Sequence, residues 1–385
     1  MRVRIWWIAA PVIVLTVAAT DWAAKRPSPS LDDEPRIVRL GSMSIDRAAH
    51  QATALASGEV LITGGCSGGG CSQVLASTEI YEPATDSFRP GPSMTIRRIS
   101  HTAIRLNDGR VLIIGGWSDR RPTSSAEIYD PESGRFVSAG EMTEVRMGPA
   151  VALLPDGRVL IAGGETATMT PVATAEVFDP ATDTFSPLPP MQTARGAHVA
   201  LSLSDGRVLL AGGHRGRGNV LASAEMFDPN SGSFHPVGDM SVPRHKHAAA
   251  LLSDGTALIV GGSDDRDHDG RYRSTEIFDP SSNTFSPGPE MHHARFKLHD
   301  AVVALPSGAV LAAGGGVSAE IFDPSARRFE LVNGHLDAAQ SFATATPLPS
   351  GDVLILGGYD DRIRPSSAAW RVVTAPGPDR TEPRP

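Results

Sequence analysis

The stretch RGAHVALSLSDGRVLLAGGHRGRGNVLASAEMFDPNSGSFHPVGDM, residues 195–240, contains every part of a unit that recurs along this chain. Its Gly-Gly pair returns about every 50 residues, a period that indicates a repeat architecture. The seven pairs are Gly64-Gly65, Gly115-Gly116, Gly163-Gly164, Gly212-Gly213, Gly261-Gly262, Gly314-Gly315 and Gly357-Gly358. The repeat therefore determines the fold.

Each unit predicts four short strands. In the quoted copy the first two flank the turn Asp205-Gly206, because Gly tolerates the positive φ of a tight hairpin. The third strand ends at Asp228-Pro229, since proline lacks a backbone donor, and the fourth begins at Phe234. One such sheet cannot bury both faces, so seven copies must pack around an axis. The predicted fold is all-β: a seven-bladed propeller of four-stranded antiparallel blades.

Three recurring motifs resemble those of the kelch-repeat family within the galactose oxidase/kelch-like propeller superfamily. They are the Gly-Gly pair, the Glu-x-aromatic-Asp-Pro block of Glu225 to Pro229, and the Met-x-x-x-Arg junction of Met240 to Arg244. The resemblance covers nearly everything from residue 35 to 373 and implies the propeller fold. It says little about activity, since one architecture supports enzymes and passive binding platforms.

The two ends of the chain predict how the ring closes. Ile37, Gly41 and Met43 repeat the fourth-strand pattern of Phe234, Gly238 and Met240, whereas the last unit stops after its third strand. Residues 36–43 are therefore expected to complete the seventh blade, which removes two exposed sheet edges. Residues 374–385 are expected to form a disordered tail.

The N-terminal segment predicts export. Arg2 and Arg4 precede an apolar run over residues 5–20, and Val17-Ala18-Ala19 suits signal-peptide cleavage. Residues 1–24 are interpreted as a signal peptide, or alternatively as a short anchor, and 25–34 as a linker. The expected location is periplasmic, cell-surface or extracellular, with membrane contact only if the segment stays uncleaved. The net charge of −8 excludes a basic field for nucleic acid, and a monomer is expected.

Residues that recur in every unit are interpreted as structural. These include the glutamates of the third strands and the aromatic that follows them, which is Tyr81 or Tyr129 in the first two units. An arginine four residues after each fourth-strand Met also recurs: Arg47, Arg98, Arg146, Arg195, Arg244 and Arg295. By resemblance these arginines are expected to form a cationic collar at the channel mouth; alternatively, each bonds carbonyls or carboxylates of a neighbouring blade. His50, His101, His198 and His247, interrupted at Pro149 and Asp300, are expected to pack inside the blades.

Residues that break the repeat are the candidate binding residues. The loops between second and third strands vary in length and lie on one face, where repeat scaffolds place binding sites. With the arginines, the residues expected to bind ligand there are Trp117, Asp119, His214, Arg215, Tyr359 and Asp360. Their mixture of charges and aromatic rings suits a small polar ligand, a glycan or a protein loop.

Two loops have chemistry of their own. Cys66 and Cys71 are expected to form a local disulfide in the first variable loop. Residues 265–276 match a calcium-loop pattern through Asp265, Asp267, Asp269 and Glu276, although Glu276 also fills the structural glutamate position. The alternatives are a calcium site or a solvated acidic insert; no cofactor is required.

The predicted function is an exported, non-catalytic binding module for a protein, glycan or other polar ligand. The alternative is a propeller enzyme acting on a carbohydrate, of the oxidase or isomerase class. Galactose oxidase-type enzymes use a Tyr cross-linked to Cys, a second Tyr and two His as copper ligands. Here only Tyr272 and Tyr359 lie outside the structural positions, and both cysteines are expected to be paired.

Overall fold

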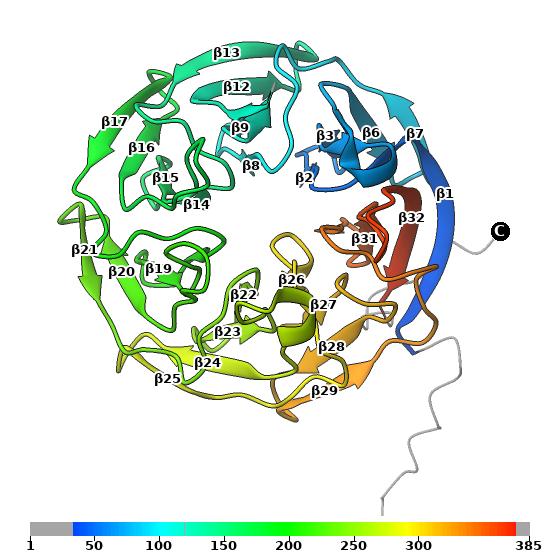
Figure 1. The fold of residues 1–385 in the computed structure, drawn as a ribbon. Helices are drawn as coiled ribbons and strands as arrows, with labels where there is room; N and C mark the ends of the chain where they lie inside the picture. The colour runs from blue at the N-terminus through cyan, green and yellow to red at the C-terminus, as the bar shows by residue number, and fades with distance from the viewer. Residues whose placement is uncertain (1–33, 119, 375–385) are drawn as a thin grey trace, which may run out of the picture.

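The computed structural model describes residues 34–118 and 120–374, which form a ring of seven four-stranded antiparallel sheets (Figure 1). The predicted signal segment, and nearly all of the predicted linker and tail, lie outside the described residues. Within them, none of the helices is long and apolar enough to cross a membrane.

The first four blades follow the chain in order, each from its innermost strand outward. Blade one contains β2 (Gln51–Ala54), β3 (Val60–Thr63), β6 (Thr78–Glu82) and β7 (Ser87–Pro90). Blade two contains β8 (Thr102–Arg105), β9 (Val111–Ile114), β12 (Ser125–Asp130) and β13 (Arg135–Glu141). Blade three contains β14 (Ala150–Leu153), β15 (Val159–Ala162), β16 (Ala175–Asp179) and β17 (Thr184–Leu188). Blade four contains β18 (Val199–Ser202), β19 (Val208–Ala211), β20 (Ala224–Asp228) and β21 (Ser233–Pro236).

The remaining blades complete the ring. Blade five contains β22 (Ala248–Leu251), β23 (Ala257–Val260), β24 (Thr275–Asp279) and β25 (Thr284–Pro287). Blade six contains β26 (Val302–Ala304), β27 (Val310–Ala312), β28 (Glu320–Asp323) and β29 (Arg328–Leu331). Blade seven contains β30 (Thr344–Pro347), β31 (Val353–Leu356), β32 (Ser366–Val373) and, from the other end of the chain, β1 (Arg36–Arg47).

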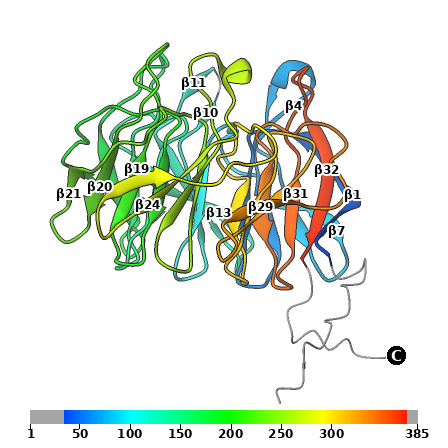
Figure 2. The same cartoon turned by 90° about the horizontal axis from the view of Figure 1, so that it is seen from below.

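Small elements decorate one face of the ring. Two hairpins are formed by β4 (Cys66–Ser67) with β5 (Gln73–Val74) and by β10 (Trp117–Ser118) with β11 (Arg121–Pro122). Two short 3₁₀ helices, η1 (Gly69–Cys71) and η2 (Asp267–Gly270), lie in the loops of blades one and five. Figure 2 shows β4, β10 and β11 on the face opposite the tight hairpin turns. We call the face that carries these loops the loop face.

Closure occurs as predicted. β1 pairs antiparallel with β32 from Arg36 opposite Val373 to Arg47 opposite Ser366, with two register shifts between them. The N-terminal strand thus forms the outer edge of a blade whose other three strands are the last three strands of the described residues (Figure 1). Joining the two ends removes the free edges that an open sheet would leave.

The core consists of apolar layers between the blades. Seven clusters of buried side chains each join two adjacent blades in the described residues; Leu209 of β19 and Phe278 of β24, for example, share one cluster. In blades one to six the third-strand aromatic packs on an aromatic of the fourth strand, with ring centroids 4.8–5.2 Å apart. This confirms the structural interpretation of Tyr81 and Tyr129.

The Gly-Gly pair is required where the second strand leaves the blade. Gly212 and Gly213 have φ of 63° and 89°, in the region that favours glycine. A Cβ on Gly212 would lie 2.5 Å from the carbonyl oxygen of Arg244, and one on Gly213 would lie 2.6 Å from that of Gly196. The pair therefore lets each second strand pass closely beneath two connecting segments.

Candidate functional site

Two rings of side chains surround the channel mouth on the loop face. The inner ring contains the residue two positions after each recurring arginine, or after Gln340, which takes the arginine position in blade seven. Its members are Ala49, Ser100, Gly148, Ala197, Lys246, Lys297 and Phe342. All seven have φ between 49° and 56°, so the fold imposes one left-handed conformation on every blade.

The inner ring is asymmetric. Blades one to four contribute only small residues, whereas blades five to seven contribute Lys246, Lys297 and Phe342. The ring is therefore open on one half and filled by long side chains on the other. Lys246, Lys297 and Phe342 adopt the left-handed conformation although it disfavours residues with a Cβ by roughly 1–2 kcal/mol.

The outer ring contains the residue after each Gly-Gly pair. Its members are Cys66, Trp117, Glu165, His214, Ser263, Gly316 and Tyr359. In six blades this residue forms an antiparallel bridge with the residue after the arginine, or after Gln340 in blade seven, as between His214 and Gly196. The repeated backbone thus fixes the position of side chains that differ from blade to blade.

A cavity of about 570 Å³ lies between these rings, within the range of small-molecule sites. It is lined by all seven inner-ring residues and by loop residues from several blades, including Met169 and Val220. Charged and polar groups at its wall include the cations Arg217, Lys246 and Lys297. They also include His214 and the carboxylates of Glu165, Asp265, Asp267 and Asp300.

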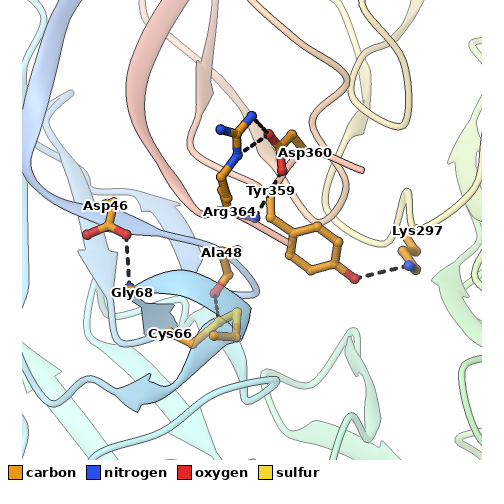
Figure 3. The surroundings of a disulfide bond; sticks show 9 residues. Asp46, Ala48, Cys66, Gly68, Lys297, Tyr359, Asp360 and Arg364 are labelled. Atoms are coloured by element: carbon orange, nitrogen blue, oxygen red, sulfur yellow. Dashed lines mark hydrogen bonds and ion pairs between the residues drawn. A yellow bond between two sulfur atoms is a disulfide. The ribbon is translucent and has the colours of Figure 1, made fainter. Parts of the chain in front are cut away.

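One wall of the cavity holds a lysine surrounded by aromatic rings. The Nζ atom of Lys297 donates a hydrogen bond to the hydroxyl of Tyr359 at 3.0 Å (Figure 3). It also lies 4.6, 5.2 and 5.6 Å from the ring centroids of Phe296, Tyr359 and Phe342. Burial lowers the pKa of Lys297 and raises that of Tyr359. The arrangement positions a half-buried cation at the cavity.

The second lysine of the mouth is paired. Lys246 Nζ lies 2.6 Å from Asp267 Oδ1, and His245 Nε2 lies 3.2 Å from the same oxygen. Burial raises the pKa of Asp267, but its hydrogen bond and ion pair with Lys246 outweigh burial, and the pKa is lowered overall. Burial and the charge of Lys246 lower the pKa of His245 to about 4, so this imidazole is neutral near pH 7.

Two further polar pairs complete the wall. His214 Nε2 lies 2.9 Å from Glu165 Oε1, and the two side chains come from adjacent blades. Gln51 Nε2 donates to Asp300 Oδ2 at 2.7 Å across blades one and six. These pairs present imidazole and carboxylate groups to the same cavity as Lys297.

A shallower groove continues outward from the mouth over blades one to three. It has a volume of about 940 Å³ and shares Ser100, Met147 and Met169 with the cavity. Trp117 lines it, as do residues 71–74 of the first variable loop. Trp117 is thus on the predicted face but lines the groove and not the cavity.

The predicted cationic collar is wrong. All six arginines are 0 % exposed, and each forms an ion pair of 3.0–3.1 Å with the third-strand glutamate of the blade it begins. Arg195, for example, also donates to the carbonyl oxygens of Gly212 and Ser223 at 3.0 and 2.7 Å. The alternative of bonds to carbonyls and carboxylates therefore describes the series, with the partners in the blade that the arginine begins and not in a neighbouring one.

The histidine series packs inside the blades, as expected. His101 Nε2 lies 2.8 Å from Thr63 Oγ1, and a Cβ on Gly64 would meet the His101 ring at 2.9 Å. The equivalent position in blade six is Leu298, which packs on Gly261, and not Asp300 as the sequence suggested. Burial lowers the pKa of His50 and His101 to about 3 and that of His198 and His247 well below 6.5.

The predicted calcium set does not come together. Glu276 is buried under the loop, where it pairs with Arg244 and accepts hydrogen bonds from the backbone of Ser241 and Val242. Asp267 pairs with Lys246, and Asp265 lines the cavity without joining an acidic cluster. In residues 34–118 and 120–374, no group of three or more His, Cys, Asp or Glu is arranged to hold a metal ion, so Asp269 does not belong to such a group either.

The remaining predicted residues have separate places. Cys66 and Cys71 form the disulfide that their spacing predicts, in a loop that Asp46 anchors by accepting from the Gly68 amide at 3.0 Å (Figure 3). Asp360 binds the side chain and backbone of Arg364, so it organises its own loop. Arg215 is exposed and does not line the cavity, and Asp119 lies outside the described residues.

The sequence interpretation missed the inner ring. Lys246 and Lys297 are two of only three lysines in the chain, and both lie two residues after a recurring arginine. Comparing that position across the copies would have shown four small residues followed by Lys, Lys and Phe. The sequence interpretation assigned the binding role to the arginines instead, because the sequence does not show the direction of their side chains.

The kelch motif matches five segments of the chain: residues 47–95, 99–143, 146–192, 195–241 and 244–292. The chain belongs to the kelch-repeat family. Its sixth and seventh blades lie beyond these segments but repeat the same sheet topology. No protein with a curated description matches this kelch protein in sequence.

Many solved structures share the kelch propeller's fold. One is a novel fungal alcohol oxidase with catalytic diversity among the AA5 family, in complex with copper. The TM-score is 0.69 at 15 % identity, over 90 % of this chain and 77 % of the oxidase chain. At that identity the likeness shows the fold alone.

A copper site of the galactose oxidase type does not fit the described residues. Both cysteines are joined in the disulfide, so neither is free to cross-link a tyrosine. Tyr81 and Tyr129 pack between strands, and Tyr272 stacks on Arg244 with the guanidinium 5.4 Å from its ring centroid.

Proposed function

We propose that this kelch propeller is a non-catalytic binding module that holds a polar ligand, glycan or protein side chain in the cavity at the channel mouth. The supporting observation is that residues which differ from blade to blade line one cavity on a rigid, repeated ring. His198 and His247 also line it, and their buried ring nitrogens have no hydrogen-bond partner among the described residues. Buried polar groups ordinarily have partners, which a ligand or water can supply.

A substitution that fills the cavity without changing the fold tests this proposal. Ala197 lies in the inner ring, where blade seven has Phe342 at the same left-handed conformation. The Ala197→Phe variant should therefore fold yet have less space at the mouth. A thermal-shift and calorimetric screen of neutral sugars, sugar acids and short peptides should find ligands that bind the parent and lose at least about tenfold in affinity for the variant. Equal binding by both proteins would place the ligand elsewhere.

A second candidate is a carbohydrate isomerase, favoured by the His214–Glu165 pair. A carboxylate 2.9 Å from an imidazole is a suitable acid-base arrangement, and both side chains line the cavity. NMR of reducing sugars incubated with the protein should then show accelerated isomerisation that Glu165→Gln removes. If no sugar isomerises under conditions in which ligands bind, the isomerase is excluded and the binding function stands.

We also propose that the protein is exported. The N-terminal segment supports this proposal, and so does the Cys66–Cys71 disulfide, because disulfides persist in oxidising compartments. Cell fractionation should find a chain that lacks about 20 N-terminal residues by intact mass. Alkylation without reductant should modify neither cysteine; two added alkyl groups in a folded, exported sample would contradict the disulfide.

A further inference from the structure

Lys297 is a positioned cation that the fold itself does not use. Its ammonium group has three donors, and one of them is bonded to Tyr359. Among the described residues no carboxylate lies within ion-pair distance of it; Asp267 and Asp361 act on it only at longer range. Lys246, the equivalent residue of the preceding blade, has Asp267 as its partner.

The position of Lys297 points to a chemical role. Ala, Ser and Gly fill the same inner-ring position in four other blades, so the propeller does not need a lysine there. Desolvation lowers the pKa of Lys297, which means that burial disfavours its charge. Three aromatic faces compensate in part, because each ring attracts a cation. An anion in the cavity would supply the missing charge partner.

We propose that Lys297, which Tyr359 holds in position, binds the carboxylate of a small organic acid in this cavity. The proposal rests on the binding function proposed above and names its ligand class. The Tyr359 hydroxyl accepts one hydrogen bond from the ammonium of Lys297, which leaves two donors for the two carboxylate oxygens. The small residues Ala49, Ser100, Gly148 and Ala197 leave room for the rest of the ligand.

A small molecule fits better than an acidic polypeptide. The cavity volume of about 570 Å³ is that of a compact ligand. Glu165, Asp265, Asp267 and Asp300 also line it, and they would repel a chain that carries several carboxylates. A single carboxylate beside Lys297, with hydroxyl groups toward Asp300 and Gln51, matches the charges present.

The test titrates acetate, lactate, D-gluconate and D-glucuronate, each with one carboxylate, into the purified protein by calorimetry, with D-glucose and a hexaglutamate peptide for comparison. At least one of the four acids should bind. Lys297→Met should weaken that acid by about 10- to 100-fold, as expected for a lost charged hydrogen bond, and Tyr359→Phe by a smaller factor. Arg215→Met is the matched control, because Arg215 is an exposed cation of the loop face outside the cavity.

The outcomes separate the two proposals. Failure of all four acids to bind, or equal affinity in the parent and both Lys297 and Tyr359 variants, would overturn the carboxylate assignment. If D-glucose binds and Ala197→Phe weakens it while Lys297→Met does not, the binding function stands and this inference fails. Tight binding of hexaglutamate alone would also contradict it, in favour of a peptide partner. Unchanged thermal stability of the Lys297→Met variant verifies that folding is intact.

Discussion

At the residue scale, the propeller uses its most regular charges for structure. Each recurring arginine is fully buried, which is tolerated because a glutamate and backbone carbonyls satisfy the guanidinium. Blade seven has no charged pair at these positions: Gln340 takes the arginine position and Trp370 the glutamate position. Trp370 pairs with Ile355 in the same register in which Glu79 pairs with Ile62 in blade one. Two neutral side chains can thus replace a buried ion pair, whereas one charged partner alone is costly.

Removing half of one pair should therefore be strongly destabilising. Glu225→Ala leaves Arg195 buried without a charge partner and is expected to lower the free energy of unfolding by about 3–5 kcal/mol in urea denaturation. Glu330→Ala removes an exposed partner of Arg328 and should cost about 1 kcal/mol or less. Similar losses in the two variants would contradict the structural role of the buried pair.

The buried histidines should make the propeller sensitive to acid. The folded-state pKa of His198 is well below the unfolded value of 6.5, so below pH 6.5 the unfolded chain binds more protons. The contribution of His198 is complete above pH 6.5 and falls by about 1.4 kcal/mol per pH unit as the pH drops toward its folded pKa.

The His198→Leu variant tests this dependence, since Leu298 occupies the equivalent position in blade six. Between pH 7 and pH 5 its free energy of unfolding should fall by about 2 kcal/mol less than that of the parent. Denaturation curves at the two pH values provide the measurement. If the parent and the variant lose equal stability, the acid sensitivity has another source.

At the scale of elements, the ring depends on one strand that crosses from the start of the chain to its end. β1 covers the outer edge of β32, and Met43 and Leu40 pack into the layer between blades seven and one. The first variable loop adds a local link, because the Gly70 amide donates to the carbonyl of Ile363 in the loop of blade seven. Both contacts join the same two blades.

Deleting residues 34–43 should expose the edge of β32 and lower the melting temperature by at least about 10 °C, since most of the pairing with β1 is lost. The matched control deletes residues 376–385, ten residues beyond the described part of the chain, and should melt with the parent. Calorimetric scans of the two truncated proteins decide the matter. A β1 deletion that melts with the parent would show that closure needs only three strands.

At the scale of the whole molecule, the two faces of the ring have different roles. The hairpin turns such as Asp205-Gly206 repeat from blade to blade, whereas the loop face carries the cavity and the groove. The loop face also carries both two-stranded hairpins (Figure 2). A rigid ring with variation confined to one face is the arrangement by which repeat proteins bind partners.

The affinity for any ligand of the protein should consequently not change when residues are substituted in the hairpin turns, which lie on the face opposite the loop face. Ser231→Ala and Asp156→Asn alter exposed turns and are expected to leave the dissociation constant within about twofold, whereas Ala197→Phe weakens it by at least about tenfold. Calorimetric titration of the three variants measures this contrast. Loss of binding in either turn variant, with the fold intact, would assign the site to the wrong face.

The sequence by itself determined the blade number, the hairpin turns, the strand exchanged at closure and the disulfide. These features depend on residue spacing and on local backbone chemistry, and both recur in the seven copies of the repeat. They include the Asp205-Gly206 turn and the Ile37-Gly41-Met43 match between the two ends.

Only the tertiary structure decided which charged side chains reach the cavity and which are buried inside a blade. Arg195 and Lys246 are both cations near the loop face, yet Arg195 turns into its blade toward Glu225 and Lys246 lines the cavity. Glu276 likewise fits a calcium pattern in sequence but lies under the loop with Arg244. The physical reason is that a side chain's direction and partners depend on the packing of strands from distant parts of the chain, which residue spacing does not record.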